Sequence, residues 1–489
     1  MFPALAGDLG SRRRCAALFT LSCVAYLPSL SGAFLLDDPF YIVFNEALRH
    51  PGQWLRFFHD ADSLSADPGL SRLIYRPLLG FSHGLNHVLF GSEAFWFHLH
   101  DVILHGANTC LVFLLARRLC GKGNWRAWAA ALLFCLHPVQ AQSVAYVGSR
   151  AGLLSLFFLQ VSLLAYASFP EDRRLSWAAF AAAAFCKESS LFFLAALPAY
   201  DVVYGPVKEP WKARVQRWLP YWAIGGVFLL ARTAVLGGVS QREPWGGSWG
   251  VHGQLAAHAM FQYVRLTVWP AGLREPYGFL LGPHFLSQAW LMAGAVAALS
   301  AASLYGLSRR ASWGFALFWY FAALAPVSNL VPFGSLMADR YLYASMLGLG
   351  LLLGGLLPER PSRPAAAAAL AAALLLGLAN IEQQLHWRSG FVLALEACEA
   401  APAEPYAAMR LATNYSTWRM FDRAEALLRL SLGAEVPVDV RRTGYKRLGQ
   451  LRLRQGRPRD AIAFLEASLA MDPRQKSVLE LLAQARRAR

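Results

Sequence analysis

The chain has 489 residues, of which 56% are hydrophobic and only 16% are charged. Soluble globular proteins average about 45–50% apolar and about 25% charged residues. This composition excludes a disordered chain, a collagen-like fibre and a disulfide scaffold, and it argues against an ordinary soluble enzyme. The formal charge of +16 lies in short basic clusters between apolar runs and in the C-terminal part of the chain. A membrane protein with a soluble tail is indicated, not a nucleic-acid-binding protein.

The apolar runs predict an all-α bundle of membrane helices over residues 1–380. A span needs about 20 mostly apolar residues, and about eleven are expected. They lie at 15–35, 96–116, 127–146, 151–168, 176–186, 190–204, 218–236, 286–306, 313–328, 340–356 and 365–380. The fifth and sixth are short because Lys187-Glu188 interrupts the apolar stretch 176–204.

Basic residues are concentrated in alternate loops, which fixes the expected orientation. The N-terminus is then cytoplasmic, the loops 36–94 and 237–285 lie outside, and the tail 381–489 is extracytoplasmic. A count of ten spans would place the tail on the other side. The first apolar run exceeds the roughly 7–15-residue core of a signal peptide, so we expect an uncleaved span.

Asp37 and Asp38 follow the first span directly. Two adjacent carboxylates repel each other and raise at least one pKa unless a cation or a metal compensates. One of them could accept a proton from a hydroxyl nucleophile. The alternative is an ordinary solvated start of a loop.

A polar stripe follows one face of the second span. His98, Asp101, His105 and Asn108 have spacings that place them on the same side of a helix. Such a stripe normally faces the bundle interior or an aqueous cavity. Metal binding, interhelical hydrogen bonds and substrate contact all remain open for it. The seven cysteines form no metal-ligand spacing, so no metal site is predicted.

The other unusual polar residues also map to the predicted outer side. They are Arg76, His137, Arg150, Lys187, Glu188, Asp339, Arg340 and Tyr341. Arg150 is either a phosphate ligand or a snorkelling anchor at the membrane boundary. Carboxylates facing several cations suit a reaction that deprotonates a hydroxyl and stabilises a departing phosphate.

In their order along the chain, these residues resemble motifs of the transmembrane and tetratricopeptide-repeat O-mannosyltransferases and their bacterial relatives, within the C-type glycosyltransferase superfamily. The matching segments are Asp37-Asp38, Tyr75-Arg76-Pro77-Leu78 with Asn86, Phe97-His98-Leu99 with Leu104-His105, His137-Pro138-Val139-Gln140, Gly148-Ser149-Arg150, Lys187-Glu188 and Asp339-Arg340-Tyr341-Leu342-Tyr343. The resemblance implies a polyprenyl-phosphate-linked sugar donor, an inverting transfer on the extracytoplasmic face, and Asp37 as the base. Gln142 and Asp339 depart from the pattern, since relatives often have Glu at both places.

The tail 381–489 is predicted to form tetratricopeptide-like helical repeats. One copy contains Leu448-Gly449, Ala461 and Leu465, and a looser copy contains Leu411-Ala412 and Ala424. Position 452 is Arg where an aromatic residue is usual. A final helix over about 474–487 would cap the stack. The repeats would bind an acceptor protein or serve assembly alone, and their arginines could touch lipid head groups.

The predicted function is a membrane glycosyltransferase that moves a sugar, with mannose as the candidate, from a polyprenyl-phosphate donor to a hydroxyl acceptor such as protein Ser or Thr. The catalytic candidates are Asp37 and Asp38, and the other outer-side residues are expected to bind substrate. No cofactor is indicated, although a divalent metal is compatible with the acidic pair. The expected location is a bacterial inner membrane with the site on the periplasmic side. The alternatives are a non-catalytic membrane scaffold and a lipid-linked glycan ligase or polymerase.

Overall fold

The computed structural model describes residues 9–67, 74–121, 124–238, 244–245, 248–277, 283–332, 334–401, 405–433, 436, 438–473 and 475–488. The chain divides into two compact units. The first, here the membrane unit, contains Met1–Leu273 and Ser287–Arg388, and the second, here the tail unit, contains Arg274–Leu286 and Ser389–Arg489. The protein is all-α: the described residues form helices, turns and irregular segments and include no strand.

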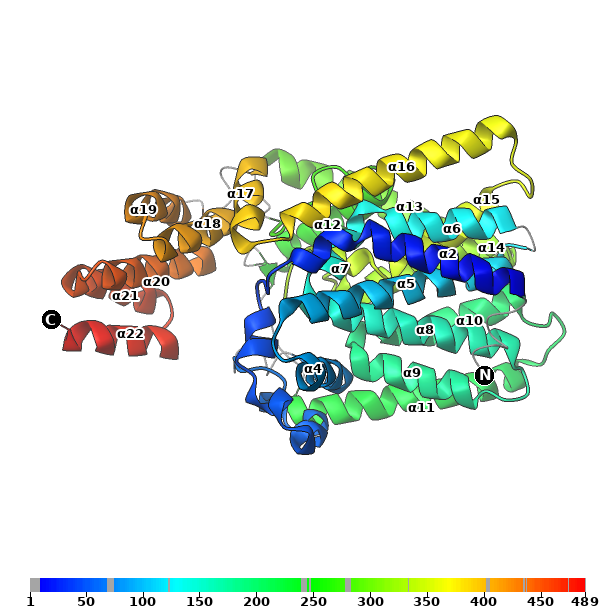
Figure 1. The fold of residues 1–489 in the computed structure, drawn as a ribbon, viewed down its shortest axis with the longest axis horizontal. Coiled ribbons are helices and arrows are strands. Elements are labelled where there is room, and N and C mark those ends of the chain that lie inside the picture. The colour runs from blue at the N-terminus through cyan, green and yellow to red at the C-terminus, as the bar shows by residue number, and fades with distance from the viewer. Residues whose placement is uncertain are drawn as a thin grey trace. The chain divides into compact units, whose positions relative to one another are not determined.

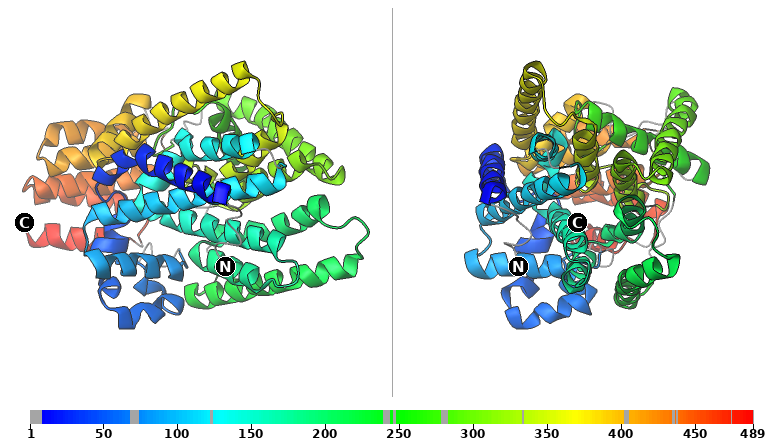
Figure 2. Two further views of the ribbon diagram at one scale, coloured as in Figure 1. Left: turned by 45° about the vertical axis from the view of Figure 1, so that its right-hand side comes forward. Right: turned by 90° about the vertical axis from the view of Figure 1, so that its right-hand side faces the viewer.

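The membrane unit is a bundle of helices that run side by side (Figures 1 and 2). In chain order they are α2 (Leu9–Ala25), α4 (Pro77–Phe90), α5 (Ala94–Leu119), α6 (Asn124–Leu136), α7 (Ala141–Ala145), α8 (Arg150–Ser168), α9 (Arg174–Cys186), α10 (Phe193–Tyr204), α11 (Trp211–Leu236), α12 (Trp249–Val268), α13 (Pro283–Ser308), α14 (Ser312–Leu324), α15 (Ser345–Leu356) and α16 (Arg363–His386). Each predicted span overlaps at least one of these helices, and the span 127–146 overlaps both α6 and α7. The structure adds α4 and α12, which lie in the loops predicted to be outside.

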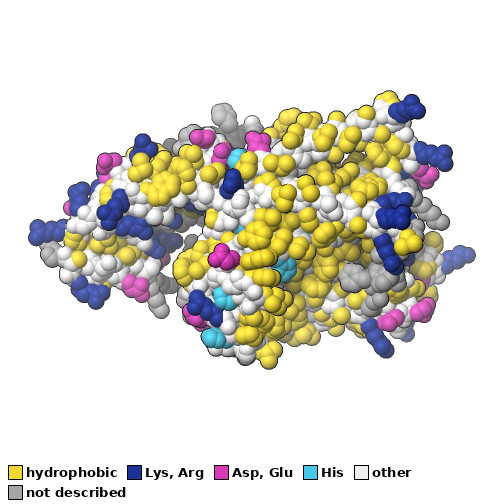
Figure 3. All heavy atoms as spheres, viewed as in Figure 1, with side chains coloured by type: hydrophobic (Ala, Val, Ile, Leu, Met, Phe, Trp, Pro, Cys, Tyr) yellow, Lys and Arg dark blue, Asp and Glu magenta, His cyan; other side chains and the backbone are white. Residues whose placement is uncertain are grey.

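Among the described residues, five stretches are long and apolar enough to cross a membrane by themselves: Ala94–Leu119, Val147–Ser168, Trp211–Leu236, Gln288–Ser308 and Arg363–His386. Only 6% of the most apolar window of the last one is buried within the protein. Its exposed leucines need an apolar environment, and Figure 3 shows hydrophobic side chains over much of the visible face of the bundle. The chain is therefore an integral membrane protein. The remaining spans are short helices, so the number of about eleven stays a prediction.

Two breaks in the helices bring backbone to the predicted outer side. Helix α6 ends at Leu136, directly before His137-Pro138, because proline cannot continue the hydrogen-bond ladder. Helix α9 ends at Cys186, and Lys187 has an extended backbone before the short 3₁₀ helix Glu188–Phe192 leads into α10. The structure thus confirms the interruption predicted at Lys187-Glu188.

Helix α5 lies at the centre of the unit and packs against α2, α6, α8 and α15. Helix α15 approaches α14 and α6 closely through glycines, as is typical of small-residue contacts between membrane helices. A methyl group added at Gly348 would lie 2.6 Å from the carbonyl oxygen of Ala316 on α14. One added at Gly350 would lie 3.0 Å from that of Ala130 on α6.

The tail unit consists of α17 (Gly390–Ala400), α18 (Pro405–Thr417), α19 (Phe421–Arg429), α20 (Val438–Arg454), α21 (Pro458–Met471) and α22 (Lys476–Arg487). Each of these helices packs against the next one along the chain. Ala424 and Ala461, the paired positions of the two predicted repeats, are both fully buried, on α19 and α21. This arrangement agrees with helical hairpins, and their assignment as tetratricopeptide repeats remains a prediction.

We expect Gly348→Ala to destabilise the membrane unit by about 1–3 kcal/mol, because the new methyl group would overlap backbone atoms of α14. Thermal unfolding of the purified protein in detergent measures this. Gly355→Ala on the same helix is the matched control, since its methyl group would meet nothing closer than 3.8 Å. Equal melting temperatures for the two variants would contradict the close approach of α15 and α14.

Candidate functional site

Asp37 and Asp38 stand at the end of the first helical segment and differ in their surroundings. Asp38 is fully buried, and its two carboxylate oxygens accept the backbone N–H groups of Leu35 at 2.9 Å and Gly148 at 2.6 Å. Burial raises the pKa of Asp38 well above its usual range, although both N–H donors oppose this shift. Asp37 is only half-buried. Asp38 therefore ties the loop to the segment before α8, and Asp37 is the more accessible carboxylate.

The backbone before this pair is strained. Leu36 has a φ of +54°, in the left-handed region that a branched side chain rarely adopts. The carbonyl of Asp37 then accepts the N–H groups of Phe40 and Tyr41, which begins the next helical turn. Strain of this kind persists where the surrounding structure fixes the chain, often at functional sites.

Tyr41 and Tyr146 connect the aspartates to the cations. Both rings are buried. Tyr41 interacts electrostatically with Asp37, Arg76 and Arg340, and burial together with Asp37 raises the pKa of its hydroxyl. Tyr146 interacts with Asp37 and Arg340 as well, and the Arg340 guanidinium lies 5.8 Å from its ring centroid. Asp37, Arg76 and Arg340 therefore all lie within electrostatic range of Tyr41, and the site roles predicted for them stay predictions.

Arg76 and Glu188 form an ion pair at this site. Arg76 precedes α4, and its Nε and Nη2 donate to the two carboxylate oxygens of Glu188 at 2.9 and 2.6 Å. The side chains are 15% and 24% exposed, so the pair is partly shielded from solvent. This two-point contact joins the segment before α4 to the break between α9 and α10.

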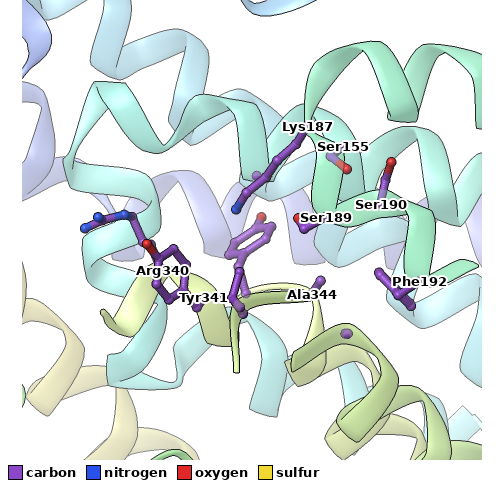
Figure 4. A pocket seen from close by; sticks show the side chains of 12 residues that line it. Ser155, Lys187, Ser189, Ser190, Phe192, Arg340, Tyr341 and Ala344 are labelled. Carbon is purple, nitrogen blue, oxygen red and sulfur yellow. The ribbon is translucent and has the colours of Figure 1, made fainter. Parts of the chain in front are cut away.

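A small pocket, with about 20 Å³ of interior space, lies beside this ion pair and is lined by Lys187, Arg340 and Tyr341. In Figure 4, Lys187 and Arg340 come from separate segments, and the Lys187 amino group points toward the turn that carries Arg340 and Tyr341. The Lys187 nitrogen and the Arg340 guanidinium lie 5.8 and 5.2 Å from the Tyr341 ring centroid. Ser155 and Ser189 add hydroxyl groups to the wall. Two cations and several hydroxyls around a small cavity suit a phosphate group.

Gln142 and Tyr343 hold the turn that carries Arg340. The side-chain oxygen of Gln142 accepts the backbone N–H of Arg340 at 2.7 Å. The hydroxyl of Tyr343 accepts a hydrogen bond from Asn108 at 3.0 Å and lies 2.9 Å from Nδ1 of His105. Asp339, at the start of the same turn, is buried. Part of the predicted polar stripe on α5 therefore supports the turn through interhelical hydrogen bonds.

Parts of the chain are similar to animal proteins named protein O-mannosyl-transferases. Protein O-mannosyl-transferase TMTC2 of Mus musculus is 34% identical over 195 residues, which cover 37% of this chain and 23% of that protein. TMTC1 of Mus musculus is 36% identical over 157 residues, covering 31% and 16%, and Tmtc2 of Drosophila melanogaster is 31% identical over 204 residues, covering 39% and 22%.

The similarity is partial. The matched region spans about a quarter or less of each of these relatives' own length. No family model matches the chain, and no solved structure matches it. These relatives are animal proteins and give no support to the predicted bacterial source.

Arg150 does not line the pocket. It is fully buried, and it donates to Asp101 at 2.5 Å, to Asn86 at 2.8 Å and to the carbonyl of Phe97 at 2.8 Å. These contacts join α4, α5 and α8. The structure therefore gives Arg150 a positioning role, in contrast to the phosphate contact or the snorkelling anchor considered from the sequence.

The two predicted histidines are also buried in structural contacts. Nε2 of His105 lies 3.2 Å from the carbonyl oxygen of Cys135. His137 accepts the N–H of Val139 at 3.4 Å, and its carbonyl accepts a hydrogen bond from Asn380 at 3.2 Å. Within the described part of the chain, no group of three or more His, Cys, Asp or Glu side chains is placed to hold a metal ion.

We expect Asp101→Asn to cost about 3–5 kcal/mol of stability, because it leaves the buried Arg150 guanidinium without its anion. This loss is measured by unfolding the purified protein in detergent with heat or with denaturant. Asp60→Asn is the control: its pair with Arg56 is exposed, and removing it should change stability by less than about 1 kcal/mol. An Asp101→Asn protein as stable as the control would refute the positioning role of Arg150.

Proposed function

We propose that this protein is an inverting membrane glycosyltransferase. It transfers a sugar from a polyprenyl-phosphate donor to a hydroxyl of a protein acceptor, on the extracytoplasmic side. The names of the relatives, protein O-mannosyl-transferases, support mannose as the sugar and Ser or Thr as the acceptor. The observation that carries the proposal is the pocket of Lys187 and Arg340, which adjoins a long apolar groove.

The groove lies among α10, α12, α13 and α14 and has a volume of about 910 Å³. Its walls are almost entirely apolar and include Ala257, Ala297 and Phe318. Phe192 lines both the groove and the cationic pocket. A ligand that fills both must have an anionic head and a long apolar tail, which is the chemistry of a polyprenyl-phosphate sugar.

The proposed reaction uses Asp37 as the base. Asp37 takes the proton of the acceptor hydroxyl, and the hydroxyl oxygen forms a bond to the anomeric carbon of the sugar. The bond from that carbon to the phosphate oxygen breaks on the opposite face, and the phosphate keeps the electron pair. Lys187 and Arg340 stabilise the charge that develops on the departing phosphate. Tyr341 holds these two cations, and the Arg76–Glu188 pair holds the loop that borders them.

The distribution of basic residues supports the proposed orientation. In Figure 1, the connections from α8 to α9, from α10 to α11 and from α15 to α16 lie at one end of the bundle. Figure 3 shows Lys and Arg side chains at this end. By the positive-inside rule this end faces the cytoplasm. The segment that follows α2 and carries Asp37 lies at the opposite end (Figure 1).

Replacing the base tests the mechanism. We expect Asp37→Asn to lower the rate of transfer by about 10²–10⁴-fold with little change in melting temperature, because an amide cannot accept the proton. The assay uses membranes that contain the variant, a radiolabelled polyprenyl-phosphate mannose and a peptide rich in Ser and Thr.

Asp38→Asn is the matched comparison, and it should lower the melting temperature, because it loses a carboxylate that accepts two backbone N–H groups. A folded Asp37→Asn protein with full transfer activity would overturn the assignment of the base.

Filling the groove tests the lipid donor. We expect Ala297→Trp to raise the KM for a long polyprenyl-phosphate donor by about tenfold or more, since an indole occupies the space of several chain carbons. A donor with a short prenyl chain should be affected much less. Ala298→Trp, the next residue on α13 but not part of the groove wall, is the control. Equal effects on long and short donors would rule the groove out as the site of the lipid chain.

A further inference from the structure

The C-terminal end of α16 is held by buried polar contacts, unlike the rest of this helix. The exposed leucines of its earlier part are Leu370, Leu374, Leu375 and Leu378. Asn380 and Gln384 are fully buried. The Asn380 amide donates to the hydroxyl of Tyr26 at 2.8 Å and to the carbonyl of His137 at 3.2 Å. The Gln384 amide donates to the carbonyl of Ala25 at 2.9 Å. These contacts fix the last turns of α16 beside the end of α2 and the break after α6.

Trp387 follows directly after α16 and stacks on Tyr146. The two ring centroids lie 5.8 Å apart, with an angle of 25° between the ring planes. The carbonyl of the next residue, Arg388, accepts the N–H of Ala33 at 3.1 Å, so the backbone on both sides of the indole is held. Trp387 is only 3% exposed. A tryptophan that anchors a helix at the membrane surface keeps part of its ring among the lipid head groups, so this burial indicates an internal role.

The short helix α7, against which α16 packs, holds Arg340 by two contacts. Tyr146 follows α7, and the Arg340 guanidinium lies 5.8 Å from the centroid of its ring. Gln142, within α7, accepts the backbone N–H of Arg340 with its side-chain oxygen at 2.7 Å. The N–H of Tyr146 in turn donates to the carbonyl of Gln142 at 3.2 Å. The backbone and the side chain of Arg340 are thus held by the same helical turn.

Gly148 leaves room for the Tyr146 ring. A methyl group added at Gly148 would lie 2.6 Å from the Tyr146 hydroxyl oxygen. The same glycine donates its backbone N–H to Asp38. The Tyr146 ring therefore lies over the backbone that anchors Asp38, with Trp387 stacked on it.

We infer that Trp387 is a positioning residue for the proposed transfer reaction, on which this inference rests. Its indole fixes the Tyr146 ring, and that ring fixes the Arg340 guanidinium beside the phosphate pocket. A guanidinium stabilises a departing phosphate only when its N–H groups point at the oxygens on which charge develops. A displacement of about 1 Å can slow such a reaction by about 10²-fold. A tryptophan that only filled space would contribute to stability and leave Arg340 unaffected.

Hydrogen–deuterium exchange of the ligand-free protein in detergent, measured by mass spectrometry, tests the positioning without any reaction. Its readout is the peptide that contains the backbone N–H of Arg340. We expect Trp387→Leu to speed exchange at this N–H by about tenfold, because a less restrained α7 opens the hydrogen bond to Gln142 more often. Trp387→Phe keeps an aromatic ring for Tyr146 and should exchange like the wild type.

Trp218→Leu is the control for a general loss of stability. Trp218 is also 3% exposed, and it lies in α11 near the connection to α10, at the end of the bundle proposed to face the cytoplasm (Figure 1). Its replacement should lower the melting temperature and leave exchange at Arg340 unchanged.

Binding of a dansyl-labelled polyprenyl phosphate, without acceptor, tests the consequence for the phosphate pocket. We expect Trp387→Leu and Arg340→Gln each to raise its Kd by about tenfold. The double variant should bind about as weakly as Arg340→Gln alone, because both changes act through one guanidinium. Trp387→Phe should restore binding.

Wild-type exchange at Arg340 in Trp387→Leu would overturn the inference, and so would equal defects in the Leu and Phe variants. Additive losses of affinity in the double variant would also overturn it, since Trp387 would then act independently of Arg340. If the wild-type protein binds no polyprenyl phosphate, the proposed donor is wrong, and the exchange measurement still decides whether Trp387 positions Arg340.

Discussion

The buried ion pair of Arg150 with Asp101 is the contact on which the candidate site depends. Both side chains are fully buried, and transfer of two charges from water costs several kcal/mol per ion unless each is compensated. Here the carboxylate, an amide oxygen and a backbone carbonyl accept the donors of the guanidinium. Because these acceptors belong to α4 and α5, the start of α8 is held against both helices. Gly148, just before that start, is the donor that holds Asp38.

The charged residues of the site therefore differ in how deeply they are buried. Arg150, Asp101 and Asp38 have no exposure, whereas Asp37, Lys187 and Arg340 are half-buried. A strained Leu36 costs about 1–3 kcal/mol, and the two N–H groups on Asp38 help to offset it. These contacts of Asp38 fix the position of the neighbouring Asp37, the half-buried carboxylate proposed as the base.

The sequence predicted that these residues share one side of the membrane, because that side follows from the position of a residue between apolar runs. Asp37, Arg76 and Arg340 are far apart in the chain, and all three act electrostatically on Tyr41. It could not predict which of them face a cavity. Arg150 and Arg340 look equivalent in the sequence, yet Arg150 turns inward to Asp101 and Asn86, which are 49 and 64 residues away. Tyr41 and Tyr146 could not be found either, since ordinary aromatic residues give no signal in a chain with 13% aromatics.

Arg452 of the tail unit departs from the repeat pattern, and its contacts explain how the structure accommodates it. The repeat pattern places an aromatic side chain there, and a buried arginine would cost free energy if nothing compensated its charge. Arg452 lies with its guanidinium 5.9 Å from the ring centroid of Phe464, and it binds Glu425 and Gln455 at 2.7 and 2.8 Å. Its methylenes fill the apolar space and its charge is neutralised. Arg447 on the same helix has other partners, the carbonyl of Met409 and the hydroxyl of Thr413. The contacts of each arginine are therefore set by the groups that face it, not by its place on the helix.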